Sequence, residues 1–137
     1  MSNRGGDVYR LYNDSMGDHM YTTSAVEKDA LVKTGWRLEG VAFHAPIGTV
    51  PIFRMFNRNA SDHLWTASFD EAEALQNLGW TYETVPFFGK GKDEPGATDV
   101  YRLYNPNDGD HFLTKSEKER DCLVDIGWVY EGVAFLV

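Results

Sequence analysis

The sequence predicts a single α+β domain of three internal repeats that close around a pseudo-threefold axis in a propeller-like ring. The stretch Val-Tyr-Arg-Leu-Tyr-Asn at 8–13 has counterparts at 51–57 and 100–105, and an Asp-His pair follows each copy. The spacings from arginine to histidine and from histidine to tryptophan are the same in every copy. Because a unit this short cannot bury a core alone, the three are expected to pack together.

Each repeat begins with the pattern of a β-hairpin. Aromatic and branched residues at 8–13 favour a strand, and the Asp-Ser-Met-Gly stretch at 14–17 has turn chemistry. Residues 19–23 return to strand composition, so the two segments are expected to pair. The same signals recur at the same offsets in the other two copies.

A short helix is expected after each hairpin. Ser24 and Glu27 form a capping box, in which the serine hydroxyl accepts from a helix amide and the glutamate reaches back. The helix should run to Thr34, because Gly35 stands where a terminating glycine belongs. One or two short strands follow over 36–43. The capping boxes recur as Ser68 with Glu71 and Ser116 with Glu119, and the terminating glycines recur as Gly79 and Gly127.

The expected boundaries are a flexible lead-in over 1–7 and one domain over 8–137, made of repeats 8–49, 50–97 and 98–137. A β-trefoil-like arrangement is the alternative, and the helix signal in every repeat disfavours it. The linker between the second and third repeats is longer than the first linker. Its surplus lies at 89–96, which is rich in Gly and Lys and predicts a surface loop.

Composition excludes several classes of function. The net charge of −8 argues against a nucleic-acid partner, which requires clustered Lys and Arg. A single cysteine excludes an intrachain disulfide framework. No apolar run approaches the roughly 18 residues of a membrane span. The first residues lack the apolar core of a signal peptide, so a cytoplasmic or non-classically secreted protein is expected rather than a classically secreted one.

The recurrent arginines Arg10, Arg54 and Arg102 are expected to belong to the scaffold. Each sits between apolar neighbours, and a buried arginine requires a partner. Glutamates at 39, 83 and 131 recur in step with them, so Arg–Glu ion pairs are predicted. The alternative is that each arginine faces a ligand.

The loop from asparagine to histidine is the candidate binding element in each repeat. It places an amide, a carboxylate and an imidazole close together, which suits sugar hydroxyls, and binding usually sits on loops. The structural alternative is that the aspartate closes the turn while the histidine bonds a neighbouring strand. The predicted ligand-binding residues are Asn13, Asp18, His19, Tyr21, Asn57, Asp62, His63, Trp65, Asn105, Asp110 and His111.

Two of these residues, Tyr21 and Trp65, occupy the variable position two after histidine. An exposed Trp65 would make the second repeat the best stacking platform. A metal site is disfavoured because the second loop, 58–62, carries only one carboxylate. No catalytic residues are predicted, since nothing resembles a nucleophile elbow, and no cofactor is expected.

The third repeat resembles a repeat family of unknown function almost word for word. The matching stretches are Val-Tyr-Arg-Leu-Tyr-Asn-Pro-Asn-x-Gly-Asp-His-Phe, then Ser-x-x-Glu, then Gly-Trp-x-Tyr-Glu-Gly-Val-Ala-Phe, and the resemblance covers about 8–137. Such repeats are found in bacterial secreted proteins, often beside cell-wall or polysaccharide hydrolases, and in some fungal proteins. The resemblance implies an accessory, glycan-directed module. The second repeat departs from the pattern at Ser61, Trp65 and 84–86.

We therefore expect a non-enzymatic carbohydrate-binding protein, a multivalent lectin with up to three related sites and glycans or polysaccharide as partners. The competing hypothesis is a protein-interaction or inhibitor module that uses the 89–96 loop. A third is a purely structural domain, in which the Asp-His pairs contribute stability and bind nothing.

Overall fold

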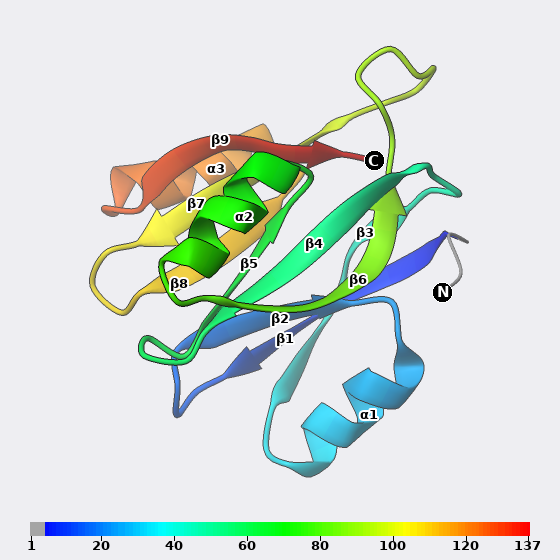
Figure 1. Ribbon diagram of the computed structural model, residues 1–137. Helices are drawn as coiled ribbons and strands as arrows, with labels where there is room; N and C mark the ends of the chain where they lie inside the picture. Colours follow the sequence, from blue (N-terminus) through cyan, green and yellow to red (C-terminus); the bar gives the residue numbers. More distant parts are fainter. Residues whose placement is uncertain (1–4) are drawn as a thin grey trace.

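The computed structural model describes residues 5–137 as three antiparallel, three-stranded sheets, each with one short helix (Figure 1). The first repeat contains β1 (Gly6–Asn13), β2 (Asp18–Thr22), α1 (Ala25–Lys33) and β3 (Arg37–Ala45). The second contains β4 (Val50–Asn57), β5 (Asp62–Thr66), α2 (Phe69–Asn77) and β6 (Thr81–Gly89). The third contains β7 (Asp99–Asn105), β8 (Asp110–Thr114), α3 (Glu117–Asp125) and β9 (Val129–Leu136).

The first strand of each repeat lies in the middle of its sheet, so the sheet orders are β2-β1-β3, β5-β4-β6 and β8-β7-β9. The predicted hairpins are present, with Asn13 opposite Asp18 and the same register in the other copies. In place of one or two short strands over 36–43, a single bulged strand begins at Arg37 and runs to Ala45, and its Gly40 has a φ of 118°. The described residues form no closed barrel, so the β-trefoil alternative is wrong.

The three helices begin at the predicted capping boxes. The Ser24 hydroxyl accepts a hydrogen bond from the Glu27 amide at 3.0 Å, and Ser68 and Ser116 do the same in their repeats. The predicted return bond from glutamate is wrong, because the three serine amides donate to the hydroxyls of Thr22, Thr66 and Thr114 instead. The helices lie on the outside of the molecule (Figure 1). Ala72 is the one helix residue that is fully buried within 5–137. No helix in this range is long and apolar enough to cross a membrane.

The core lies where the three hairpins meet. Strands β2, β5 and β8 each contact the other two, and every residue of these strands is buried. Phe43, Phe87 and Phe135, from the third strand of each repeat, form an aromatic cluster with ring centroids 5.7–6.1 Å apart. The three repeats thus contribute to one shared core.

The domain begins earlier than the sequence pattern indicates. Strand β1 starts at Gly6, which pairs with Ala45, so the end of the predicted lead-in belongs to the sheet. Residues 1–4 of that lead-in lie outside the described residues. Loop 89–96 projects from the rest of the molecule at the top of Figure 1.

Candidate functional site

The Asp-His pairs lie in the core and join the repeats to one another. His63 Nδ1 lies 2.7 Å from a carboxylate oxygen of Asp18 in the preceding repeat. His111 is held in the same way by Asp62, at 2.7 Å, and His19 by Asp110 of the third repeat, at 2.6 Å. Each repeat therefore offers an aspartate to the next, and the third offers one to the first. We call these six residues the Asp-His ring.

The Nε2 atom of each histidine connects the Asp-His ring to one of the predicted Arg–Glu pairs. His63 Nε2 lies 2.9 Å from Glu83, which also accepts a hydrogen bond from Arg54 at 3.0 Å. Arg54 then donates two hydrogen bonds to Glu27 of the first repeat, at 2.9 and 2.8 Å. The pairs of Arg10 with Glu39 and of Arg102 with Glu131 confirm the same prediction.

The junction between the third and first repeats lacks the last link of this network. Arg102 reaches Glu71 of the second repeat just as Arg54 reaches Glu27, but within residues 5–137 Arg10 pairs only with its own Glu39. The Arg10 guanidinium instead lies 4.8 Å above the ring of Phe112. The residues at the sequence position of Phe112 in the other two repeats are Met20 and Leu64, which have no aromatic face.

These contacts raise the pKa of two histidines. Burial alone would lower the pKa of His63, but hydrogen bonds and charge from Asp18 and Glu83 outweigh it and raise the pKa to about 9. Asp62 and Glu131 raise the pKa of His111 to about 9 in the same way. Burial also raises the pKa of Asp62, against the opposing effect of His111, to about 6. At neutral pH the Asp62–His111 pair is therefore charged on both sides.

The raised histidine pKa values predict that the protein loses stability in mild alkali. In the unfolded chain histidine titrates near pH ~6.5, so between that pH and about 9 the folded protein binds more protons. The free energy of unfolding should then fall as pH rises through this window, by roughly 3 kcal/mol for His63. Urea denaturation at pH values across the window measures the slope. A His63→Gln variant should show a shallower slope, and an unchanged slope would contradict the assignment.

The predicted surface position of the Asp-His residues is wrong, because all six are buried. Tyr21 and Trp65 have no exposed surface, so Trp65 cannot serve as an external stacking platform. The Tyr21 hydroxyl bonds the Leu113 backbone of the third repeat. Asn13 accepts hydrogen bonds from the backbone amides of residues 15 and 16, and the other two asparagines close their turns similarly. None of the eleven predicted ligand residues lines the open pocket described below.

Three carboxylates of the ring lie near one another. Asp18, Asp62 and Asp110 each place an oxygen within 4.8 Å of the other two, an arrangement that a cation could in principle use. Each of these aspartates already bonds a histidine of the neighbouring repeat. The cluster belongs to the ion-pair network between repeats, although Asp62 Oδ1 is buried without a hydrogen-bond partner among the described residues.

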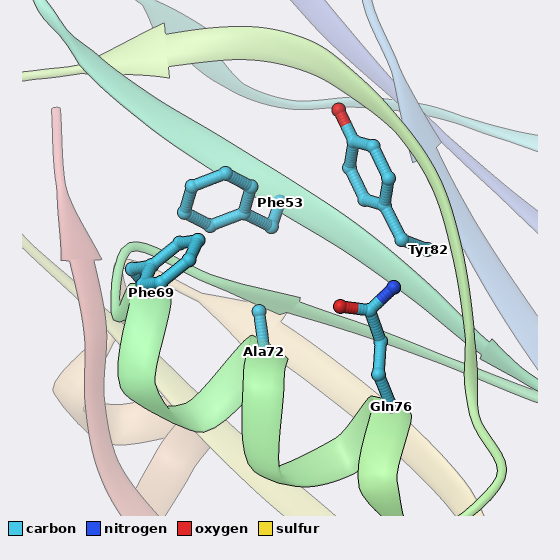
Figure 2. Close-up of a pocket in the computed structure, with 5 residues that line it drawn as sticks. All are labelled: Phe53, Phe69, Ala72, Gln76 and Tyr82. Carbon is cyan, nitrogen blue, oxygen red and sulfur yellow. The ribbon is translucent and has the colours of Figure 1, made fainter.

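An open pocket lies elsewhere, between α2 and its own sheet. Figure 2 shows Phe53 of β4 and Tyr82 of β6 facing Phe69, Ala72 and Gln76 of the helix. The three helix residues fall on one face because their spacings are three and four. The cavity has a volume of about 170 Å³, and Phe69 and Tyr82 expose 63% and 45% of their surface. It is a small aromatic site with one amide, open to solvent.

In the other two repeats, a basic side chain fills the equivalent slot. Lys28, which aligns with Ala72, places its Nζ 4.6 Å from the ring centre of Tyr9. Arg120, which also aligns with Ala72, lies 4.6 Å from Tyr101 and 5.4 Å from Tyr130. The second repeat is open because alanine stands in place of the cation. Comparison of positions 28, 72 and 120 in the sequence would have revealed this difference.

The comparisons with known proteins identify a family without an assigned activity. A family model described as a domain of unknown function (DUF5648) matches residues 7–137, which is nearly the whole chain. No curated protein and no solved structure matches the chain.

Proposed function

We propose that this chain, which belongs to the family described as a domain of unknown function (DUF5648), is a non-enzymatic carbohydrate-binding module. In this proposal the three repeats close around a pseudo-threefold axis as a propeller-like ring. The Asp-His ring holds the repeats together, and the pocket between α2, β4 and β6 binds the sugar.

The observation that carries the proposal is the open aromatic pocket of the second repeat. Phe53, Phe69 and Tyr82 offer ring faces against which the apolar C–H face of a sugar ring can stack. The Gln76 amide both donates and accepts hydrogen bonds, as required for sugar hydroxyls. A cavity of about 170 Å³ suits one ring-sized group rather than a large ligand.

The filled slots limit the number of sites. Lys28 and Arg120 lie over the rings that a sugar would need in the first and third repeats. The expectation of up to three related sites is therefore replaced by a proposal of one site, in the second repeat.

Phe69→Ala tests the site directly. Phe69 is 63% exposed at the start of α2, so its loss should leave the fold intact while removing one wall of the pocket. We expect affinity for a sugar found on a glycan array to fall by roughly tenfold, as measured by calorimetry. Leu78→Ala, at an exposed residue after the same helix, is the matched control and should bind normally. Equal affinities of the two variants, or an array without hits, would contradict the proposal.

A second candidate function, protein recognition through loop 89–96, rests on the order within that loop. Lys90 Nζ donates to the Pro95 carbonyl, and the Gly91 amide donates to the Glu94 carboxylate. A projecting loop fixed in this way offers a preformed surface to a protein partner. Shortening the loop distinguishes the two candidates, because sugar binding in the α2 pocket should survive the deletion.

A further inference from the structure

We infer that the sugar bound by the second repeat carries a positively charged amine, as in oligosaccharides of β-1,4-linked glucosamine. The inference rests on the proposed function and names the class of sugar for the same pocket. It comes from what occupies the equivalent slots in the other repeats.

In both filled slots the cation has two partners, an aromatic ring and the carboxylate of the next residue. Lys28 Nζ lies over Tyr9 and 3.5 Å from Asp29. Arg120 lies over Tyr101 and 3.0 Å from Asp121. In these two repeats a strand aromatic residue and a helix carboxylate therefore form a cation site. The basic side chain of the same helix, Lys28 or Arg120, occupies that site.

The second repeat keeps an aromatic residue on the strand and a carboxylate at the same helix position, and it lacks the cation. Phe53 stands where Tyr9 and Tyr101 stand in the other repeats, and Phe69 adds another ring. Tyr82 corresponds to Tyr130 of the third repeat, whereas the first repeat has Leu38 at that position. Glu73 follows Ala72 as Asp29 follows Lys28, so an exposed carboxylate stands at the same sequence position, next to the pocket lining rather than within it. Within residues 5–137, no basic side chain lies within ion-pair distance of Glu73.

A cationic ligand group would complete this arrangement from outside. An ammonium over aromatic faces is attracted by the ring electrons, and a nearby carboxylate adds to the attraction. The net charge of −8 further favours a positively charged polysaccharide over an anionic one. A neutral sugar gains the stacking alone, so the charged and neutral forms of one sugar should differ in affinity.

The experiment compares two oligosaccharides that differ only at nitrogen. Calorimetry measures binding of a β-1,4-linked glucosamine oligomer and of its N-acetylated counterpart, at a mildly acidic pH that keeps the amines charged. We expect the glucosamine oligomer to bind roughly tenfold more tightly. Glu73→Gln should reduce that preference, because it removes the carboxylate without changing the pocket's aromatic walls.

Ala72→Lys supplies the decisive variant, since it restores the residue type found at position 28. The new lysine should fill the pocket from within and abolish binding of both sugars while the protein stays folded. Ala74→Lys adds the same charge at an exposed position of the same helix, outside the pocket, and should still bind.

The outcomes separate the two proposals. Equal or tighter binding of the N-acetylated oligomer would overturn the cationic inference and leave carbohydrate binding intact. If neither oligomer binds and no glycan is bound on an array, both proposals fail. Capture of an oligolysine peptide without sugar binding would overturn both as stated, and would identify a peptide cation as the occupant.

Discussion

Asp18→Asn is expected to lower the free energy of unfolding by roughly 3–5 kcal/mol. Asp18 is 1% exposed, and it accepts hydrogen bonds from both the imidazole and the backbone amide of His63. The substitution removes the charge that balances a buried histidine at the junction of the first and second repeats. Losing one partner of a buried ion pair costs more than the pair contributes, because the remaining charge stays desolvated. Chemical denaturation at neutral pH measures the loss.

The chain contains a matched control for this substitution. His44 and Asp7 form another Asp–His pair, with Nδ1 2.6 Å from the carboxylate, but the two side chains are 78% and 46% exposed. Asp7→Asn should cost less than about 1 kcal/mol, because water solvates both of these exposed side chains in the absence of the pair. Similar small losses for the two variants would show that the Asp-His ring does not hold the repeats together.

Phe87→Ala is expected to have an effect of the same size, roughly 3–5 kcal/mol of unfolding free energy. Phe87 is 1% exposed and contacts Phe43 and Phe135, one from each of the other repeats. Truncation removes buried apolar surface and leaves a cavity where the three repeats meet. The change should lower the thermal midpoint of the whole domain in one cooperative transition, since the repeats share this cluster.

Phe88→Ala is the control, because it removes the same side chain from the adjacent residue of β6. Successive residues of a strand point to opposite faces, and Phe88 is only partly buried. Its loss should cost clearly less than the loss of Phe87. Should the two variants prove equally stable, the aromatic cluster would not be a principal contact between repeats.

The local structure was predictable from the sequence because its causes are local. The capping boxes at Ser24, Ser68 and Ser116 specify where the helices begin. Turn chemistry specifies the hairpins, and the recurrent spacing of Arg54 and Glu83 identifies an ion pair within one sheet. All of these signals involve residues of one repeat, so they can be recognised without knowing how the repeats pack together.

The Asp-His ring was misplaced because its partners come from different repeats. A turn followed by Asp-His has the composition of a surface binding loop. Whether it faces solvent depends on how the three hairpins pack, and that packing buries His63 against Asp18 of another repeat. The same packing buries Trp65, whose size and position had indicated a stacking platform.

The α2 pocket depends on a difference between repeats rather than on a shared motif. Ala72 alone is an unremarkable helix residue. Its importance follows from comparison with Lys28 and Arg120, which occupy the same position in the other repeats and lie over aromatic rings. The fold is recognised from residues that are the same in all three repeats. The proposed site, in contrast, depends on position 72, where the second repeat differs from the other two.

The central claim is that binding occurs at the α2 pocket and not at the loops that carry the Asp-His pairs. Amide chemical-shift mapping by NMR, during titration with a glucosamine oligosaccharide, tests it most directly. We predict that the perturbed amides cluster at residues 53, 69–76 and 82, with the loops at 13–19, 57–63 and 105–111 unchanged. Perturbations centred on those three loops would contradict the claim and place the ligand at the Asp-His residues instead.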